Sequence, residues 1–451
     1  MSIAIPIPIA ITTNSITIPM NIMIMTRTIL FLFLSLCSTA SLLSGQAARH
    51  LWVAGEPNTI TEYDPVTFAV KQKLTVPSWI SRNLEGLAAN AKGQLLATPS
   101  SNPAVLPSDV NPDKGKLWFW NGQTGVLLDR GETIKTVSAN QQEKQVEIRP
   151  QGLLSADGSV LYWFANEYHK VIAREGPSEL ERSVQTNFRA WHTDLGGGNR
   201  MPIAQFSFPP CKCETGVCSE TCPEAVVFGP AGGLDDFFLV THRTEGQIGS
   251  TLHASFLYRR NGDKWTTSKL PNMVEDLLDG ARSGSLLVQA LRDGGCCGWD
   301  NEGNDQTFLT RNGRDSVLFD ERARYANPNY DVSFFTSNAL LSPESSYIAL
   351  TVTSSLQPGA ELRLSAEGKA NAEELTRIRK GISELPVVEI LRLESVPAPV
   401  VRIPHAELVG WLNHSEILVI EAQTPVIYNV GGKAPRRALI KVPGASHVLL
   451  R

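Results

Sequence analysis

The sequence predicts an all-β fold, a β-propeller of seven four-stranded antiparallel blades. Six segments repeat one pattern: an apolar strand, a short polar turn and a second apolar strand. Most continue into a third strand and a tight turn such as Asn121-Gly122 or Asn312-Gly313, and Asn-Gly is the strongest short hairpin signal because both residues accept positive φ. The chain ends hold the strands of one more unit, so joining them closes a ring.

The first strand of each repeat aligns on one apolar position. The six matching positions are Leu87, Leu153, Val227, Leu277, Leu340 and Leu408. They lie 50 to 74 residues apart, and recurrence on this scale indicates stacked or radial units. Six or eight blades stay open, because the 74-residue interval is long enough to hold a partial unit.

The seventh blade is predicted to be shared between the two ends of the repeat region. Residues 51–55, 59–63 and 68–74 read as three strands without a first strand, and His447–Arg451 reads as a lone strand. We expect Val448–Leu450 to pair beside Leu51–Val53, because this pairing covers two sheet edges that would otherwise invite aggregation.

Two of the hairpins resemble those of a known class of propellers. Residues 154–161 (LSADGSVL) and 341–350 (LSPESSYIAL) resemble the S-P-D-G-x-x-I-A hairpin of WD40-like, TolB-type exported bacterial propellers. Residues 51–65 (LWVAGEPNTITEYDP) are similar to blades of the streptogramin-lyase and YVTN type. The resemblance implies the fold and does not imply an activity.

Residues 1–47 are predicted to be a leader and signal peptide, and 48–451 a single propeller domain. The leader has no acidic residue, one basic residue (Arg27) and an apolar run from Ile29 to Leu43. This run is shorter than the roughly 20 residues that cross a bilayer. Small residues before Ala48 fit cleavage near Ala47, so we expect a secreted or periplasmic protein without a transmembrane segment. Leu36 disfavours lipidation at Cys37.

One face of the propeller is predicted to carry the function. We name the strands of a blade a to d from the centre outward, so that b–c and d–a connections share one face. The b–c connections are long: 99–115, 165–187, 242–254, 292–306 and 356–386. Long loops in compact domains are functional or disordered more often than not, although drift at loop tips is the alternative. The connection 356–386 holds a helical insertion around 359–383. Its helix, Ala370–Ile382, is expected to stop at Gly381. The helix is expected either to cap the central opening or to lie on the surface without a function.

Six cysteines follow the leader, and export favours disulfides between them. They are Cys211, Cys213, Cys218, Cys222, Cys296 and Cys297. Vicinal cysteines pair poorly with each other, so we expect Cys296 or Cys297, or both, to cross to the 211–222 cluster. The connectivity stays open, and a zinc or iron–sulfur site is the alternative.

Two further groups of residues are candidates for chemistry on the same face. The catalytic candidates are Glu167, His169, His242, Arg243 and His253, which would act together as a general base or metal ligands beside an oxyanion-stabilising arginine. The metal candidates are Asp300, Glu302 and Asp305, whose oxygen atoms surround a glycine as in a calcium loop. The alternatives are surface or packing histidines and a solvated polar loop, and no cofactor is predicted beyond calcium or zinc at these places.

The function is accordingly predicted to be binding or scaffolding, with the b–c face presented to a protein or glycan. The net charge of −4, from 41 basic and 45 acidic residues, provides no attraction to nucleic acid. The alternative is a hydrolase or lyase with a metal or His/Glu site at the central mouth. The sequence favours no enzyme class and leaves the oligomeric state open.

Overall fold

The structure is a computed structural model, and a defined part of the chain is described. The described residues are 49–54, 58–77, 84–90, 92–99, 116–129, 135–139, 142–148, 151–155, 159–175, 178–196, 198–207, 222–228, 237–246, 249–261, 264–270, 276–280, 286–291, 305–325, 332–356, 372–432, 435–437, 442 and 447–450. All of them belong to the unit Arg49–Arg451, which is described here by itself.

Within these residues six antiparallel sheets have four strands each. In order from strand a, they are β30 (His447–Leu450), β1 (Leu51–Ala54), β2 (Thr59–Tyr63) and β3 (Val70–Thr75); β4 (Leu84–Ala89), β5 (Leu95–Pro99), β6 (Lys116–Trp120) and β7 (Gly125–Asp129); β14 (Cys222–Phe228), β15 (Phe237–Gly246), β16 (Gly249–Asn261) and β17 (Lys264–Lys269); β18 (Asp276–Gly280), β19 (Leu286–Leu291), β20 (Gln306–Arg311) and β21 (Arg314–Asp320); β22 (Val332–Leu341), β23 (Tyr347–Leu356), β24 (Val387–Arg392) and β25 (Ala398–Pro404); and β26 (Ala406–Trp411), β27 (Glu416–Glu421), β28 (Thr424–Asn429) and β29 (Arg436–Arg437).

One further described sheet has six strands. It contains β8 (Lys135–Ala139), β9 (Gln142–Ile148), β10 (Gln151–Leu154), β11 (Val160–Glu175), β12 (Ser178–Asp194) and β13 (Met201–Ser207). The prediction of four strands in every blade is therefore wrong for this sheet. β11 and β12 are so long that β10 pairs only as far as Phe164, and the β8–β9 hairpin pairs with β11 farther along, at Glu167–His169.

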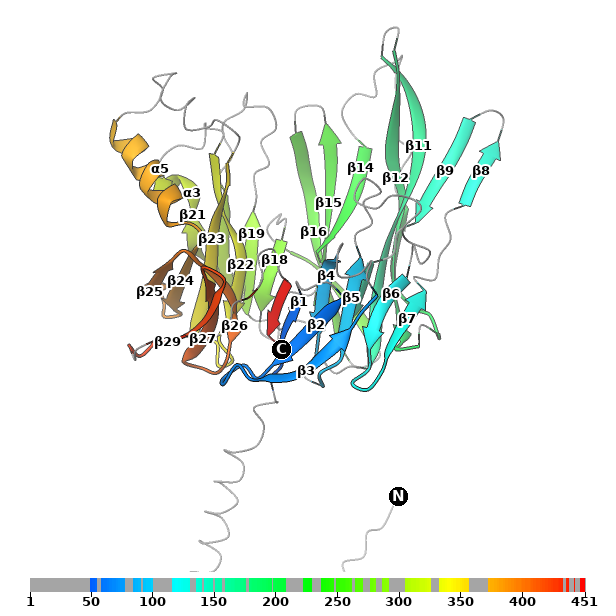
Figure 1. Cartoon of the computed structure of the whole chain (residues 1–451). Coiled ribbons are helices and arrows are strands. Elements are labelled where there is room, and N and C mark those ends of the chain that lie inside the picture. Colours follow the sequence, from blue (N-terminus) through cyan, green and yellow to red (C-terminus); the bar gives the residue numbers. More distant parts are fainter. Residues whose placement is uncertain are drawn as a thin grey trace, which may run out of the picture. The chain divides into compact units, whose positions relative to one another are not determined.

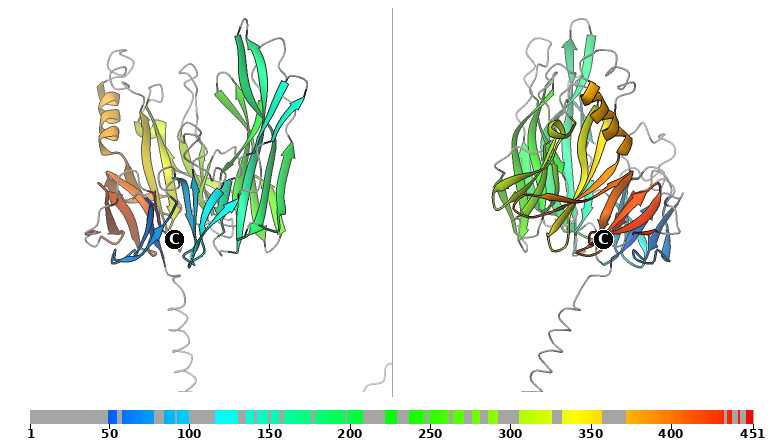
Figure 2. Two further views of the ribbon diagram at one scale, coloured as in Figure 1. Left: turned by 45° about the vertical axis from the view of Figure 1, so that its right-hand side comes forward. Right: turned by 90° about the vertical axis from the view of Figure 1, so that its left-hand side faces the viewer.

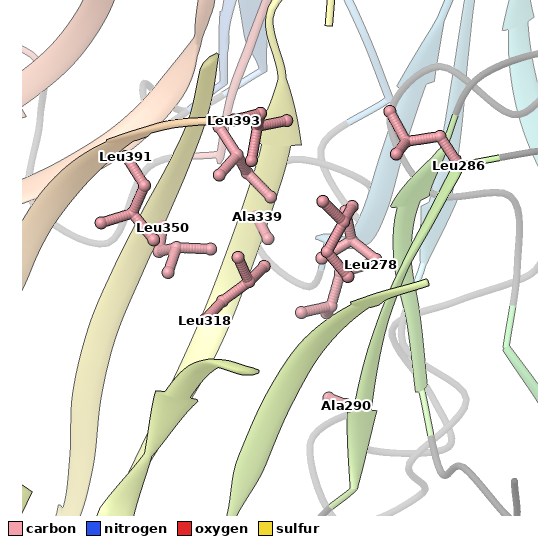
Figure 3. Packing of buried hydrophobic residues seen from close by; sticks show 11 residues of the cluster. Leu278, Leu286, Ala290, Leu318, Ala339, Leu350, Leu391 and Leu393 are labelled. Carbon is pink, nitrogen blue, oxygen red and sulfur yellow. The ribbon is translucent and has the colours of Figure 1, made fainter. Parts of the chain in front are cut away.

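The sheets form a closed ring, which makes the fold an all-β propeller (Figures 1 and 2). Each sheet shares a hydrophobic cluster with the next along the chain, and the β26–β29 sheet shares one with β1 and β30. Figure 3 shows one cluster, in which Leu278 and Leu318 come from one sheet and Ala339 and Leu350 from the next. Burial of one such leucine stabilises the fold by about 1.5–3 kcal/mol, so these interfaces hold the ring together.

The ring closes through the two ends of this unit, as the sequence predicts. β1 lies between β2 and β30, with Trp52 opposite Leu449 and Leu51 opposite Leu450 in antiparallel register. Leu51 and Trp52 are fully buried and Leu450 is 5% exposed. The six aligned apolar positions of the repeat all lie on strands a of their sheets, namely β4, β10, β14, β18, β22 and β26.

Helix α5 (Ala372–Glu384) lies in the b–c connection between β23 and β24. Gly381 does not end it, contrary to the sequence-based expectation. A Cβ atom at Gly381 would lie 2.4 Å from Cε1 of Tyr325, so the glycine lets the Tyr325 ring pack against the helix. Tyr325 ends the short helix α3 (Glu321–Tyr325) and stacks on Phe334, and Ile378 of α5 joins the same buried cluster. Gly381 therefore allows α5 to pack against Tyr325, and it does not end the helix.

Candidate functional site

The b–c face carries the largest additions to the propeller. The predicted loops 165–187 and 242–254 are, in the described residues, mostly continuations of strands: β11–β12 and β15–β16 are long hairpins. Figures 1 and 2 show both hairpins and α5 rising from the same side of the ring. We call the two hairpins and α5 the hairpin rim. The asymmetry that the sequence predicts is present, but hairpins and a helix build much of it.

Four of the five catalytic candidates, all except His169, lie at irregularities of these hairpins. The register of β11 and β12 shifts between Glu167 and Tyr168, and that of β15 and β16 shifts between His242 and Arg243. The second shift leaves His253 as the extra residue of a β-bulge, because Ala254 pairs with His242 and Leu252 with Arg243. Bulges re-aim side chains and are over-represented beside active sites.

The structure places the backbone of these candidates and not their side chains. His169 pairs with Val184 of β12 and Val146 of β9. The side chains of all five catalytic candidates lie outside the described residues, so the expected convergence is untested. Among the cysteines, Cys222 opens β14 opposite Glu245. The sulfur of Cys222 and the whole of Cys211, Cys213, Cys218, Cys296 and Cys297 also lie outside the described part, and their pairing stays a prediction.

One metal candidate is placed, and it lies beside a carboxylate that the sequence analysis missed. Asp300 and Glu302 fall outside the described residues, whereas Asp305 is 7% exposed at the start of β20. Its neighbour is Glu321, the first residue of α3, which is 4% exposed. The backbone N–H of Glu321 donates to the Asp305 carbonyl at 3.0 Å, and Phe334 N donates to Oε1 of Glu321 at 2.7 Å. Glu321 therefore joins the outer edge of one blade to strand a of the next.

Burial makes Glu321 a proton-binding group near neutral pH. Desolvation, and to a smaller extent the charge of Asp305, raises the pKa of Glu321 from 4.5 to about 7. The folded protein therefore keeps a proton that the unfolded chain releases between these two values. Ionisation of Glu321 costs stability as the pH rises from 4.5 through 7, and the full cost remains above 7.

We expect the substitution Glu321→Gln to remove this pH dependence. At about pH 8 it should raise the free energy of unfolding by about 1–2 kcal/mol relative to the natural protein, and at about pH 4 the difference should be near zero. Urea unfolding at both pH values measures it. Glu373→Gln is the matched control, because the Glu373 side chain is 86% exposed on α5. A stability difference for Glu321→Gln that is equal at both pH values would contradict this prediction.

A second buried carboxylate, Glu389, organises the base of α5. It lies on β24 within an otherwise apolar run and is 8% exposed. Arg324 Nη1 lies 2.7 Å from its Oε2, and Arg402 Nε donates to its Oε1 at 3.3 Å. Arg402 also pairs with Glu384, the last residue of α5. The ion pairs of Glu389 with Arg324 and of Arg402 with Glu389 and Glu384 fix α3 and α5 to the blade. A lone acid in an apolar strand was the sequence signal that could have found Glu389.

The described residues contain neither a metal-ligand cluster nor a membrane-spanning helix. No three His, Cys, Asp or Glu side chains in that part of the chain lie together so that they would hold a metal ion. None of its helices combines the length and the apolar character needed to span a bilayer.

Comparison with known proteins is confined to distant structural similarity. No family model and no curated protein matches the chain. A solved structure from Lactobacillus plantarum aligns with a TM-score of 0.43 and 10% identity, covering 89% of this chain and 99% of that one. Citrobacter koseri AztD aligns at 0.37 and 11%, covering 90% and 98%. Saccharomyces cerevisiae Sqt1 aligns at 0.37 and 8%, covering 80% and 76%. At these scores the similarity adds nothing on function, and the fold rests on the strand order above.

Proposed function

We propose that this protein is an exported, seven-bladed β-propeller that binds a protein partner on its hairpin rim. The count of seven takes the six-stranded sheet as a blade, in which β10–β13 fill the four regular places and β8–β9 are an addition. The observation that carries the binding role is the concentration of long hairpins and a docked helix on one side of the ring. Binding residues are disproportionately found on such segments held by a rigid scaffold.

The export part of this proposal is supported by the leader pattern and by the resemblance to exported TolB-type and YVTN-type propellers. We expect the protein recovered from the periplasm or medium to begin at or near Ala48, which its intact mass shows. We propose that its six cysteines are paired, and peptide mapping without reductant checks this. A full-length mass in the cytoplasm, or six free thiols after export, would contradict these two points.

Site-specific photo-cross-linking tests the rim. Benzoylphenylalanine in place of Glu175, the last residue of β11, is expected to give one defined protein adduct in the producing cells. The matched control is the same group in place of Val126, a 41% exposed residue on the outer strand of another blade. Adducts of the same masses at both positions would contradict the proposal. An adduct that carries only sugar would replace the protein partner by a glycan.

The second candidate function is hydrolysis or elimination at the mouth of the ring. The observation that favours it is the coincidence of Glu167, His242, Arg243 and His253 with two β-bulges. Elemental analysis of the purified protein tests the metal form of this reading. One equivalent of zinc or calcium that is lost in the variant His242→Ala but kept in His405→Ala would favour the enzyme.

A further inference from the structure

The face opposite the hairpin rim contains a pocket between two blades. It has a volume of about 640 Å³ and lies where the β20–β21 turn, the β22–β23 turn and the end of β24 meet. This volume falls within the range of roughly 300–1,000 Å³ typical of small-molecule sites. The sequence predicts no role for this face, because its turns are short.

The floor of the pocket is apolar. Leu286 and Leu393 line it and are 7% and 9% exposed. Both belong to the hydrophobic cluster between the β18–β21 and β22–β25 sheets, and Figure 3 shows them at its periphery. The pocket therefore gives access to the end of a packed core.

The wall of the pocket holds two arginines and one carboxylate. Arg311 Nη2 donates to the carbonyl of Leu393 at 3.3 Å, which ties its guanidinium to the neighbouring blade. Arg392 Nη1 donates to Oε1 of Glu394 at 3.4 Å, and its Cζ lies 6.0 Å from the centre of the Tyr347 ring. The other polar lining residues, an asparagine and two serines, are neutral, so the lining carries one excess positive charge.

The corresponding places at two other joints between blades are filled. Between the β30–β3 sheet and the β4–β7 sheet, His50 packs on Gly93 of the β4–β5 turn, with its Cε1 2.9 Å from the position of a Cβ there. Between the β22–β25 sheet and the β26–β29 sheet, Tyr347 stacks on Trp411 with ring centres 6.3 Å apart. The open pocket is thus not a general property of how these blades meet.

We propose that this pocket binds a small organic monocarboxylate with an apolar body. Guanidinium groups bind carboxylates through paired N–H donors, and Arg311 and Arg392 present such donors above an apolar floor. A single negative charge balances the excess positive charge, whereas a dianionic phosphate would leave a surplus beside Glu394. The ligand is either a free acid or the carboxyl-terminal residue of a peptide, which present the same chemistry. The inference does not depend on the hairpin rim.

Calorimetric titration of the intact exported protein tests the proposal. N-acetyl-leucine is expected to bind with a Kd on the order of 1 mM, as its small size allows, and N-acetyl-leucinamide at least about tenfold more weakly. Arg392→Gln is expected to weaken the acid about tenfold, and Glu394→Gln to strengthen it severalfold. Acetyl-Ala-Ala-Leu separates the two sources: tighter binding than N-acetyl-leucine identifies a peptide end, and weaker binding a free acid.

The control variant is Arg314→Gln, an exposed arginine just beyond the same β20–β21 turn that does not line the pocket. It should bind as the natural protein does. The thermal midpoint of each variant shows that it is folded. Equal binding of acid and amide, an equal loss in Arg314→Gln, or no binding of the acid at about 20 mM, roughly twenty times the expected Kd, would overturn the proposal.

Discussion

Removal of residues 447–451 is expected to abolish the folded ring. These residues contain β30, the innermost strand of its sheet, which pairs with β1 over four residues. Without β30, the buried side chains of Leu51 and Trp52 lose one covering layer and β1 acquires an open edge. At about 1.5–3 kcal/mol for each buried apolar side chain, losing Leu450 and uncovering Leu51 and Trp52 costs up to about 4.5–9 kcal/mol, which is comparable to the whole stability of a typical domain.

The measurement is the soluble yield and the elution volume of the shortened chain. We expect aggregated protein and no cooperative thermal transition. A chain that lacks only Arg451 is the control, because Arg451 lies outside β30. A monomeric truncated protein with an unchanged midpoint would show that β30 is not needed to close the ring.

The substitution Gly381→Ala is expected to detach helix α5 from the propeller. The new Cβ would lie 2.4 Å from Cε1 and 2.9 Å from Cδ1 of Tyr325, and that ring has little freedom to move because Phe334 stacks on it at 3.8 Å. Overpacking of this kind costs about 1–3 kcal/mol. Alanine favours the helix itself by about 1 kcal/mol over glycine, so the sign of the net change tests the packing directly.

We therefore expect Gly381→Ala to lower the free energy of unfolding, measured in urea, by about 1 kcal/mol, which is the overpacking cost less the gain in helix propensity. We also expect faster amide exchange in α5. Ser383→Ala is the matched control, because Ser383 is exposed in the same helix and should change stability little. A stabilised Gly381→Ala protein would mean that helix propensity, and not the contact with Tyr325, decides the site.

Much of the fold follows from local pattern, and the exceptions have identifiable causes. The six aligned positions and the pairing of β1 with β30 are predictable because alternating apolar strands and Asn-Gly turns are encoded within a few residues. The extension of strands beyond the regular blade is not predictable in this way. Apolar periodicity does not tell whether polar stretches such as 165–187 form a loop or a hairpin. The prediction that the helix ends at Gly381 was wrong, because a glycine that ends a helix and a glycine that makes room for a neighbouring ring look alike in sequence.

The candidate sites were less predictable than the fold. Glu321 and Glu389 gain their character from burial against neighbouring elements. A lone acid in an apolar strand is a sequence signal for Glu389, whereas no local motif distinguishes Glu321. The pocket at Arg311 and Arg392 depends on which side chains fill the joints between blades, a property of pairs of turns that the sequence does not place together. The predicted residues on the hairpin rim share a face because all b–c connections do, which the repeat pattern alone determines.

The antiparallel pairing of β1 and β30 also sets how the ring responds to force. Leu51 begins β1 and stands opposite Leu450, which ends β30, so segments attached before Leu51 and after Leu450 leave the sheet from the same end. Tension between two such attachments pulls the strands apart one residue pair at a time, like a zipper, instead of shearing all their hydrogen bonds together. The seam that completes the circle is therefore expected to open by unzipping under such a load.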